Sequence, residues 1–519
     1  MNTLRFILIL VVLICQPVRA QNAVRVIYRT FVNGNELPGG ARTVIETDGE
    51  TVRIISLTVE KQRPQMPSPV QSSFIDLEGR YYINLAEMSD GSRISTVTNF
   101  NDLPTAEISS DFEVIAGYKC VRSRVIYFSN TIDIWYTTDA GLAGTPAPAY
   151  GVPEGLVLRI VRNGNNVTEA ERVESVRDRD FSLSIPGNRG KETDRMTFEY
   201  LLREAFVTTV TVFDNDVINW EGEVVNPAFG MGDTLYRFAG GTVILKKVTL
   251  PEVHDRYSLF AEVTEYSAGD AYDRTGTVFV IPQGEPLTFL DGLTKGHTAL
   301  PLYNDRHGKE YRGVAATGQY SPPLELVRFF TPFGVSDYNA KRTVPGLVWE
   351  DSAFYKQEIT HYLPLLRGQV WIGAFIGNYD RGGHRLSLRL KYFPETRDLN
   401  PEPSAAKWIK PVFNTLPVME MAGQQYGTMF DGDTLSVSVD IPEDLGSLRM
   451  VFITTGHGGW GGGDEFNQKM NELLVDGRRV WSFVPWRSDC GTYRNYNPAS
   501  GNFWNGLSSS DYSRSGWCP

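Results

Sequence analysis

The stretch HRLSLRLKYF, residues 384–393, alternates apolar and polar side chains along its length. A period of two residues places the apolar side chains on one face of an extended chain, which is typical of a half-buried β-strand. The same pattern predicts an all-β chain of antiparallel sheets, with sandwiches as the architecture and EYLLREA (199–205) as a short helix. The other stretches that show it are TVRIISLTV (51–59), TVFVI (277–281), LELVRFF (324–330), QVWIGAFI (369–376) and DTLSVSVDI (433–441).

Two polar stretches interrupt the alternation, PGNRGKETDR (186–195) and PETRDLNPEPSAAK (394–407). Proline cannot donate to the hydrogen-bond ladder of a sheet, so we expect these stretches to lie between domains. A chain of about 500 residues is long enough for roughly three domains. The predicted domains are 21–197, 198–395 and 405–519.

The first twenty residues form a separate segment. Arg5 is followed by the apolar run FILILVVLIC and by the small residues Val18 and Ala20. This order is typical of a signal peptide, and the apolar run is too short to span a bilayer. We therefore expect 1–20 to be a signal peptide and the mature chain to be secreted or periplasmic, without a membrane span.

Charge and cysteine content narrow the function further. The formal net charge of −11 excludes the basic surface that a nucleic-acid-binding protein needs. Of the four cysteines, Cys15 belongs to the signal peptide, whereas Cys490 and Cys518 lie in one loop-rich region. In an exported chain this favours a disulfide between Cys490 and Cys518, and it leaves Cys120 as a buried free thiol.

The stretch HGGWGGGDEF (457–466) follows Gly456, and Gly456, Gly458 and Gly461 have the glycine spacing of a phosphate-binding loop. Asp464 and Glu465 would repel a phosphate, and the next apolar runs flank Asp476-Gly477, which predicts a β-hairpin in place of a helix. The glycines would instead let the chain approach a bulky ligand closely. Trp460 or His457 would offer a flat face, and six of the ten tryptophans lie after residue 405, as expected for stacking on sugar rings.

The six histidines are scattered without a metal-binding spacing, so no metal and no cofactor is expected. Carboxylates and arginines remain as the working groups. Asp273 and Arg274 lie where the loop of SAGDAYDRTGTVFVIP (267–282) enters a strand, a suitable place for acid–base chemistry. The alternative is that Asp273 caps a turn, that Glu465 is a solvated loop acid, and that Arg274 and Arg514 are surface charges.

Several segments resemble, in the right order, the motifs of the peptide:N-glycosidase F family, bacterial amidases that remove N-linked glycans from asparagine. The resemblance covers 207–519, and Tyr272 stands where the family has the tryptophan of a catalytic Trp-Asp-Arg loop. The segments that carry it are VTVFDNDVINW (210–220), SAGDAYDRTGTVFVIP (267–282), VRFFTPFGV (327–335), DTLSVSVDIPEDLGSLRMVFITTGHG (433–458), DEFNQKMNELLVDG (464–477) and SRSGWCP (513–519).

The resemblance implies two jelly-roll sandwiches packed side by side with the site between them. The second sandwich is expected to be incomplete, because the family continues beyond the position of Pro519. Asp273 would be the primary catalytic acid with Glu465 opposite, and Cys490 would pair with Cys518. The implied substrate-binding residues are Tyr272, Arg274, His457, Trp460, Arg514 and Trp517.

The chain departs from the family at two points that concern the site. The family has an accessory glutamate on the strand that matches 369–379, where this chain has no carboxylate, and Asp380 lies just beyond. The cysteines of the disulfide-bonded loops around the family's two catalytic carboxylates are also missing. Separately, residues 117–161 resemble the GLPGLI family of exported proteins, which indicates a β-rich N-terminal domain without a known activity.

Together these features predict a secreted, monomeric amidase that acts on N-glycosylated proteins or glycopeptides. Its products would be aspartate and the free glycan as a glycosylamine. The alternative is a non-catalytic N-glycan-binding protein with the same paired fold. A copper monooxygenase, which can also use paired jelly rolls, would need converging histidines that the scattered positions do not suggest.

Overall fold

The chain divides into two compact units, Met1–Phe206 and Val207–Pro519, each with its own sheets. No helix in the described ranges is long and apolar enough to cross a membrane. The predicted signal peptide 1–20 and Trp460 lie outside these ranges. The computed structural model describes residues 23–37, 41–57, 69–176, 183–229, 233–253, 257–270, 272–332, 345–394, 408–416, 418, 434–458, 463–497 and 509–519.

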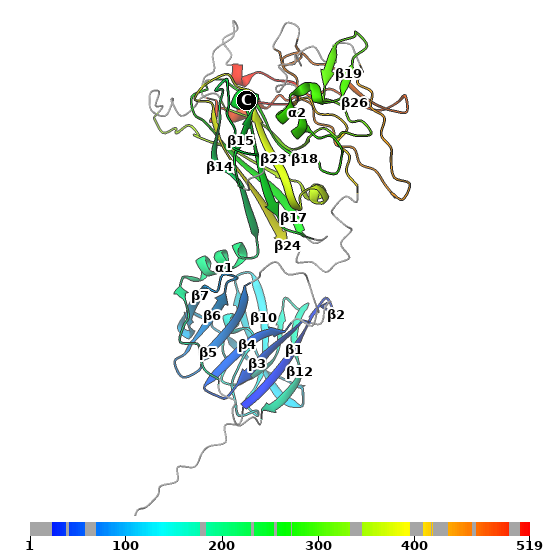
Figure 1. The fold of residues 1–519 in the computed structure, drawn as a ribbon. Helices are drawn as coiled ribbons and strands as arrows, with labels where there is room; N and C mark the ends of the chain where they lie inside the picture. The colour runs from blue at the N-terminus through cyan, green and yellow to red at the C-terminus, as the bar shows by residue number, and fades with distance from the viewer. Residues whose placement is uncertain are drawn as a thin grey trace, which may run out of the picture. The chain divides into compact units, whose positions relative to one another are not determined.

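The N-terminal unit contains one large sheet, antiparallel except for the last pair, in which β13 runs parallel to β7. The strand order is β13-β7-β6-β5-β4-β3-β1-β12-β11-β10-β9-β8, with β2 paired to β1 (Figure 1). The strands are β1 (Ala23–Val32), β2 (Asn35–Glu36), β3 (Arg42–Thr47), β4 (Thr51–Leu57), β5 (Val70–Asp76), β6 (Tyr81–Glu87), β7 (Arg93–Asn99), β8 (Glu107–Ile115), β9 (Tyr118–Tyr127), β10 (Asn130–Thr137), β11 (Leu156–Arg162), β12 (Asn166–Val176) and β13 (Lys191–Glu192), with short 3₁₀ helices η2 (Phe100–Asp102) and η3 (Pro148–Tyr150).

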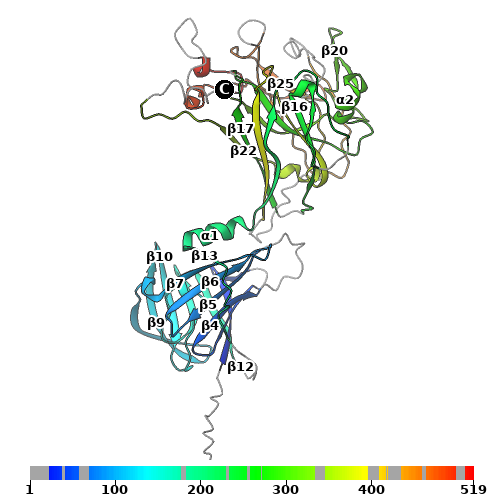
Figure 2. The ribbon, with the colours of Figure 1, turned by 60° about the vertical axis from the view of Figure 1, so that its left-hand side comes forward.

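The large sheet curves so that distant strands share one core (Figure 2). Ile45 of β3 and Ile115 of β8 belong to the same buried cluster, although several strands separate them in the sheet. Cys120 lies in this cluster as a buried free thiol, which confirms the expectation for that residue. The hydroxyl of Tyr28 donates to the carbonyl of Val157 at 2.5 Å, so the buried phenol has its hydrogen-bond partner.

The predicted short helix is confirmed as α1 (Arg195–Glu204). It begins earlier than the apolar pattern suggested, because the side chain of Asp194 accepts a hydrogen bond from the backbone N–H of Thr197 and caps the helix. Phe198 packs against Ala86 and Ile94, which places α1 in the N-terminal unit. The contacts divide the chain after this helix, and the domain limits 21–197, 198–395 and 405–519 stay predictions.

The C-terminal unit contains a sandwich of two sheets with strand orders β14-β24-β17-β22 and β15-β16-β23-β18-β21 (Figure 1). The strands are β14 (Thr208–Ile218), β15 (Tyr236–Phe238), β16 (Val243–Leu250), β17 (Tyr257–Ser267), β18 (Thr275–Ile281), β21 (Leu324–Phe330), β22 (Ala353–Glu358), β23 (Gly368–Ile376) and β24 (His384–Pro394). Smaller elements are β19 (Leu302–Asn304), β20 (Glu310–Arg312), α2 (Phe289–Lys295), η4 (Ala239–Gly241), η5 (His297–Ala299), η6 (Thr360–Leu365), η7 (Cys490–Tyr493) and η8 (Ser509–Asp511).

The two sheets of the sandwich differ in how many of their faces are covered. In β24 buried residues alternate with more exposed ones, so the four-stranded sheet turns one face to solvent. In β18 the residues from Gly276 to Ile281 are all buried. Phe279 and Ile281 form a second core with Phe289 of α2, which covers the other face of the five-stranded sheet. The all-β prediction is confirmed, and β18 becomes the rigid element that follows the predicted catalytic loop.

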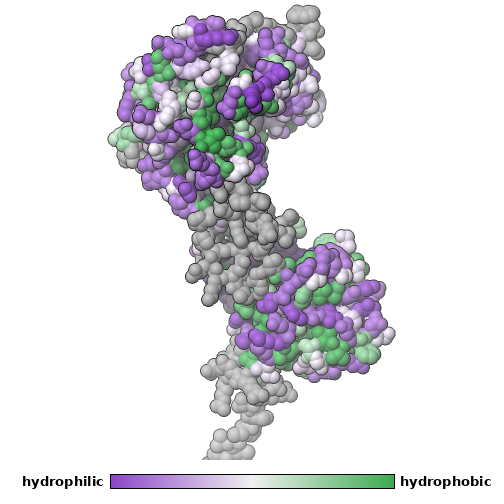
Figure 3. All heavy atoms as spheres, turned by 90° about the vertical axis from the view of Figure 1, so that its right-hand side faces the viewer, coloured by the Kyte–Doolittle hydropathy of each residue, from purple (hydrophilic) through white to green (hydrophobic). Residues whose placement is uncertain are grey.

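The hairpin predicted after the glycine-rich stretch is confirmed as β25 (Asn471–Val475) and β26 (Arg478–Phe483). Asp476 and Gly477 have φ values of 49° and 74°, the left-handed turn that Asp-Gly favours. The hairpin of β25 and β26 is the one regular sheet in the described part of the chain after β24. Residues 434–441 join no sheet there, although their apolar and polar side chains alternate. The second jelly roll therefore stays a prediction, and apolar residues reach the surface of this unit (Figure 3).

The double burial of the five-stranded sheet gives a test of its packing. A Cβ at Gly373 of β23 would lie 2.2 Å from the ring of Phe279, which is fully buried. We expect Gly373→Ala to lower the free energy of unfolding of the C-terminal unit by about 1–3 kcal/mol, because the ring cannot move without disturbing the core. Thermal unfolding followed by tryptophan fluorescence measures this. A Cβ at Gly318 meets nothing within 4 Å, so Gly318→Ala should unfold like the parent, and equal behaviour of both variants would contradict the packing.

Candidate active site

Asp273 lies in the short connection that enters β18. The following residue is held on both sides, because the Arg274 N–H donates to Thr331 Oγ1 at 2.8 Å and the Thr331 N–H donates to the Arg274 carbonyl at 2.8 Å. Since β18 is buried on both faces, the backbone around Asp273 is attached to the most rigid part of the sandwich. This position meets the requirement that a working carboxylate be held in place.

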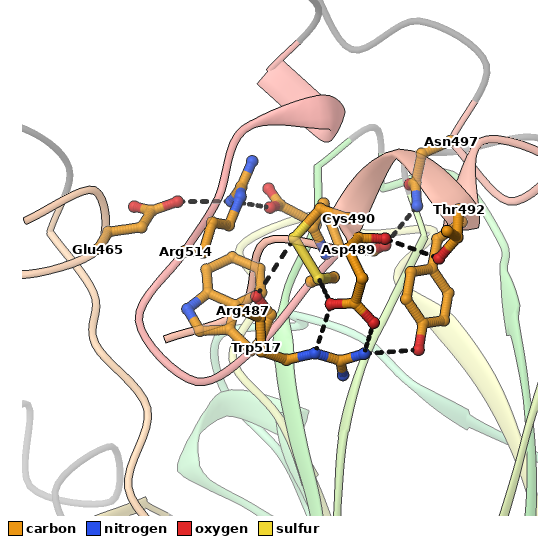
Figure 4. The surroundings of a disulfide bond; sticks show 12 residues. Glu465, Arg487, Asp489, Cys490, Thr492, Asn497, Arg514 and Trp517 are labelled. Atoms are coloured by element: carbon orange, nitrogen blue, oxygen red, sulfur yellow. Dashed lines mark hydrogen bonds and ion pairs between the residues drawn. A yellow bond between two sulfur atoms is a disulfide. The ribbon is translucent and has the colours of Figure 1, made fainter. Parts of the chain in front are cut away.

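Arg514 brings the two predicted carboxylates together. Its Nη1 lies 3.0 Å from Asp273 Oδ2. The same nitrogen lies 2.5 Å from Glu465 Oε1 (Figure 4). The arginine side chain is only 2% exposed, and the two carboxylates are 16% and 17% exposed. Because both oxygens contact one nitrogen, they are at most about 5.5 Å apart. The sequence placed these three residues far apart, and the fold brings them to one point.

The environment of Asp273 alters its acidity. Burial raises the pKa of the Asp273 carboxyl above its ordinary value, although the charges of Arg514 and Arg274 act to lower it. The carboxyl is therefore a stronger base when ionised than an exposed aspartate would be. A shift in this direction suits a group that exchanges protons during a reaction.

Aromatic rings support Arg514 from below. Its guanidinium carbon lies 4.5 Å from the ring centre of Trp517, which stacks on Phe330 at 4.5 Å with an interplanar angle of 13°. The indole Nε1 donates to the Gly456 carbonyl at 2.6 Å. Trp517 is only 5% exposed. In this structure Arg514 contacts both carboxylates and Trp517 packs against Arg514. Direct contact of Trp517 or Arg514 with a sugar stays a prediction.

A disulfide fixes the C-terminal segment that carries Arg514. Cys490 and Cys518 are bonded, with their Cα atoms 5.1 Å apart, as the resemblance implied (Figure 4). The backbones of Arg487 and Arg514 also exchange two hydrogen bonds, at 2.8 and 2.9 Å. Asp489 binds the Arg487 side chain through two hydrogen bonds, which steadies the neighbouring turn. The disulfide and the backbone hydrogen bonds together hold Arg514 in position next to the two carboxylates.

The glycine-rich stretch is packed against that segment. A Cβ at Gly456 would lie 2.5 Å from Ser515 Cβ, and one at Gly463 would lie 2.2 Å from the His457 carbonyl oxygen. Gly456 leaves room for the side chains of Ser515 and Asp464, and Gly463 leaves room for the backbone of His457 and Gly458. Asp464 Oδ1 accepts the His457 N–H at 2.9 Å, so this carboxylate caps the loop. The loop thereby presents the neighbouring Glu465 to Arg514.

The exposed predicted residues lie on the outer side of the Asp273 loop. Tyr272 is 63% exposed, and Arg274 lies over its ring at 5.2 Å. Tyr379, which sequence reasoning did not single out, is also exposed, and its ring centre is 5.9 Å from the same guanidinium. Its ring lies 5.9 Å from that of Trp220. The signal in the sequence was its position directly after β23, three residues beyond the end of the strand.

Sequence reasoning also missed a buried charged group behind the loop. Asp270 binds Arg274 through two hydrogen bonds and approaches His384, which in turn contacts Glu265. The available signal was a charged residue at an inward position of β17 and another at the start of β24. Asp380 caps the turn before β24, because its Oδ1 accepts the N–H groups of Gly382 and Gly383. Among the described residues no group of three or more metal-binding side chains occurs.

His457 is a neutral histidine inside the site. Its Nε2 lies 2.9 Å from Thr455 Oγ1 and 3.4 Å from Thr275 Oγ1, and its ring stacks on Trp517. Burial lowers the pKa of His457 to about 3, and the charges of Arg328 and Arg514 add to the effect. In the unfolded chain the same side chain binds a proton below its ordinary pKa of about 6.5.

This difference predicts acid sensitivity. The pKa is lower in the folded state, so the stabilisation is present above about pH 6.5 and is lost as the pH falls towards 3. At pH 5 the loss should be about 2 kcal/mol in the free energy of unfolding. His457→Gln, which cannot titrate, should lose less stability than the parent between pH 7 and pH 5 in denaturant unfolding. His307→Gln, at an exposed turn, should behave like the parent, and equal acid sensitivity of all three proteins would contradict the assignment.

Comparison with known proteins places this arrangement in a family. Family models described as "Peptide-N-glycosidase F, N terminal" and "Peptide-N-glycosidase F, C terminal" match residues 209–392 and 425–519. A model described as "N-glycanase peptide, N-terminal domain" matches residues 26–200, the region in which GLPGLI-like features occur. No curated protein sequence matches the chain.

Among solved structures, that of PNGF-II in a P21 crystal is 38% identical to this chain, covers 96% of this chain and 91% of that chain, and has a TM-score of 0.78. A second crystal form of PNGF-II gives 36% identity and a TM-score of 0.72 over 96% and 90% of the two chains. The structure of PNGase F, a glycosylasparaginase from Flavobacterium meningosepticum, is 15% identical to this chain. The match covers 60% of this chain and 80% of that chain, with a TM-score of 0.34. With a 38% identical relative covered over nine tenths of its length, and N-glycanase models along most of the sequence, the chain belongs to the peptide-N-glycosidase F family.

Proposed function

We propose that this protein is an exported amidase that hydrolyses the amide between the asparagine side chain and the first N-acetylglucosamine of N-linked glycans. The observation that carries the proposal is the convergence of Asp273 and Glu465 on the buried Arg514, in a chain of this family. Family membership supports an N-glycanase-like function, and the geometry supports acid–base chemistry at that point.

The reaction needs one water molecule and a group that moves its protons. In the proposed step, Asp273 accepts a proton while the water oxygen adds to the carbonyl carbon of the asparagine side chain. The carbon–nitrogen bond then breaks, and the proton passes to the departing nitrogen. The peptide keeps an aspartate, and the glycan leaves as a glycosylamine that decays to the reducing sugar. The raised pKa of Asp273 favours this exchange, because the carboxyl must both take and return a proton.

Arg514 has a supporting part in this scheme. A single guanidinium nitrogen that contacts both carboxylates keeps two like charges close together, which unpaired carboxylates would resist. Glu465 then faces the substrate from the opposite side and binds the first sugar or the amide. When substrate arrives, either carboxylate can exchange its contact with Arg514 for one with the substrate, without leaving the arginine unpaired.

The exposed side chains are the proposed sugar contacts. Tyr272 and Tyr379 offer aromatic faces on which pyranose rings stack, and Arg274 between them donates hydrogen bonds to sugar or peptide oxygens. His457, whose neutral ring stacks on Trp517, is a further proposed substrate-binding residue. Trp460 remains a predicted sugar contact outside the described residues.

Two other activities fit part of the geometry. A spacing of at most about 5.5 Å between two carboxylates is also compatible with retaining glycosidases, which use carboxylates about 5–5.5 Å apart. That reaction would leave a sugar on asparagine, so its products differ. A non-catalytic N-glycan-binding protein is the second alternative, and it would bind glycopeptide and change neither component.

The biological setting follows from the same features. We propose that the predicted signal peptide 1–20 directs export, which suits both the Cys490–Cys518 disulfide and N-glycosylated proteins as substrates. We also expect the protein to act as a monomer, without a metal or other cofactor. Size-exclusion chromatography with light scattering would test the oligomeric state.

The decisive experiment incubates the purified full chain with a defined N-glycopeptide and follows peptide and glycan by mass spectrometry. We expect asparagine to become aspartate and the intact glycan to be released. Asp273→Asn should lower kcat by about 10²- to 10⁴-fold, since it removes the proton acceptor and keeps the size of the side chain.

Asp305→Asn makes the same chemical change at a turn away from the site, between β19 and β20, and should leave kcat unchanged. A peptide that retains one N-acetylglucosamine would indicate a glycosidase. Binding of the glycopeptide by the folded parent, with no product, would indicate the non-catalytic alternative. Full activity of the Asp273→Asn variant would refute the proposed role of Asp273.

A further inference from the structure

A carboxylate lies inside the sandwich where an apolar residue is expected. Along β17, Leu259, Ala261 and Val263 are buried at alternate positions, and the next inward position is Glu265, which is also fully buried. A charged group in such a place is costly unless it is paired and hydrogen-bonded. Its presence therefore needs an explanation beyond packing.

Its partner is His384, the first residue of β24, which is fully buried as well. His384 Nδ1 lies 2.6 Å from Glu265 Oε1, and its Nε2 lies 3.3 Å from Asp270 Oδ2. Burial raises the pKa of Glu265, whereas its hydrogen bond to His384 lowers it, and the 2.6 Å contact between His384 Nδ1 and Glu265 Oε1 favours the ion pair. Two ionised carboxylates can only accept hydrogen bonds, so His384 between them donates from both ring nitrogens and carries a positive charge. Burial alone would lower the pKa of His384, but the bonds to Asp270 and Glu265 raise it to about 9.

Asp270 passes the contact on to the active-site loop. Its Oδ2 accepts Arg274 Nε at 2.7 Å, and its Oδ1 accepts Arg274 Nη2 at 3.2 Å. Oδ1 also accepts the backbone N–H of Tyr272 at 3.1 Å. Despite burial, the bonds to His384 and Arg274 hold the pKa of Asp270 down, at about 2. Asp270 therefore holds the residues on both sides of Asp273: the backbone of Tyr272 and the side chain of Arg274.

The four groups alternate in charge, from Glu265 through His384 and Asp270 to Arg274. With the histidine protonated, they sum to zero. If His384 were neutral, the two buried carboxylates of Glu265 and Asp270 would have only the positive charge of Arg274 to balance them. The positive potential of Arg274 at Asp273 would then be weaker. Tyr355 of β22 is a further titratable group near Glu265, and its hydroxyl donates to the Phe330 carbonyl at 2.5 Å.

We propose that the buried series Glu265–His384–Asp270 positions the loop of Asp273 and Arg274, and that the positive charge of His384 is required for it. The inference rests on the proposed function in that Asp273 is taken as the proton acceptor. His384 touches no substrate in this scheme and acts through Asp270 and Arg274. Its loss should misplace the loop and reduce the field of Arg274 on Asp273.

Two variants test the proposal. His384→Gln removes the charge but leaves Glu265 unpaired in the interior, which destabilises the fold. Glu265→Gln/His384→Gln removes one negative and one positive charge, so the interior keeps its net charge, and the Asp270–Arg274 pair loses its charged neighbour His384. Arg385→Gln changes the next residue of β24, whose side chain is exposed, and serves as the matched control.

With the glycopeptide substrate, we expect the double variant to show a roughly ten- to hundredfold lower kcat at an unchanged melting temperature. The acidic limb of its pH profile should move to higher pH, because Asp273 has lost part of the field that favours its ionised form. Arg385→Gln should show neither change. A folded double variant with the parent's kcat and pH profile would overturn the proposal, as would a loss of activity that only follows the folded fraction.

Two measurements do not need activity, so they separate failure of this proposal from failure of the proposed function. Hydrogen–deuterium exchange of the peptide that covers 268–275 should become faster in the double variant and not in Arg385→Gln. In protein labelled with ¹⁵N-histidine, the signals of His384 are identified as those that disappear in His384→Gln or in the double variant. In the parent these signals should remain those of a doubly protonated ring up to about pH 8. A ring that loses its proton near its ordinary pKa, or unchanged exchange, would overturn the positioning role even if the protein proves to be a lectin.

Discussion

The burial of Arg514 is the constraint on which the site depends. A guanidinium that is only 2% exposed is tolerable only where negative charge and aromatic surface compensate for lost water. Asp273, 241 residues earlier in the sequence, and Glu465, 49 residues earlier, supply the charge. Trp517 supplies the surface. The chain must therefore bring its last described segment back to the start of β18, and the Cys490–Cys518 disulfide secures that return.

The sandwich gives this arrangement a rigid base because its two sheets are used differently. The four-stranded sheet keeps one polar face, whereas the five-stranded sheet is covered on both sides, so β18 has no freedom to shift. A loop that enters such a strand inherits its position. This explains why Asp273 can remain partly exposed and still be fixed, with its backbone neighbours bonded to Thr331 and Asp270.

The alternating patterns predicted the strands well, since the period of two identifies faces without knowledge of partners. They could not predict which strands pair. Residues 434–441 alternate as clearly as β24 yet join no sheet in the described part of the chain. For the site, motif resemblance indicated Asp273, Glu465 and Arg514, but the burial of Trp517 depends on stacking with Phe330 from a distant strand. Glu265 and His384 escaped because their meeting depends on the register of β17 and β24.

Two arginines from different parts of the chain thus act on the carboxylate of Asp273. From the C-terminal segment comes Arg514, and from the sandwich interior comes the alternating series that ends at Arg274. Each arginine is already bound to another carboxylate, Glu465 or Asp270, so neither can neutralise Asp273 fully. Burial therefore keeps the upper hand over the two positive charges, and the pKa of Asp273 rises. A carboxylate that is held by Arg514 and is still basic is what the proposed hydrolysis requires.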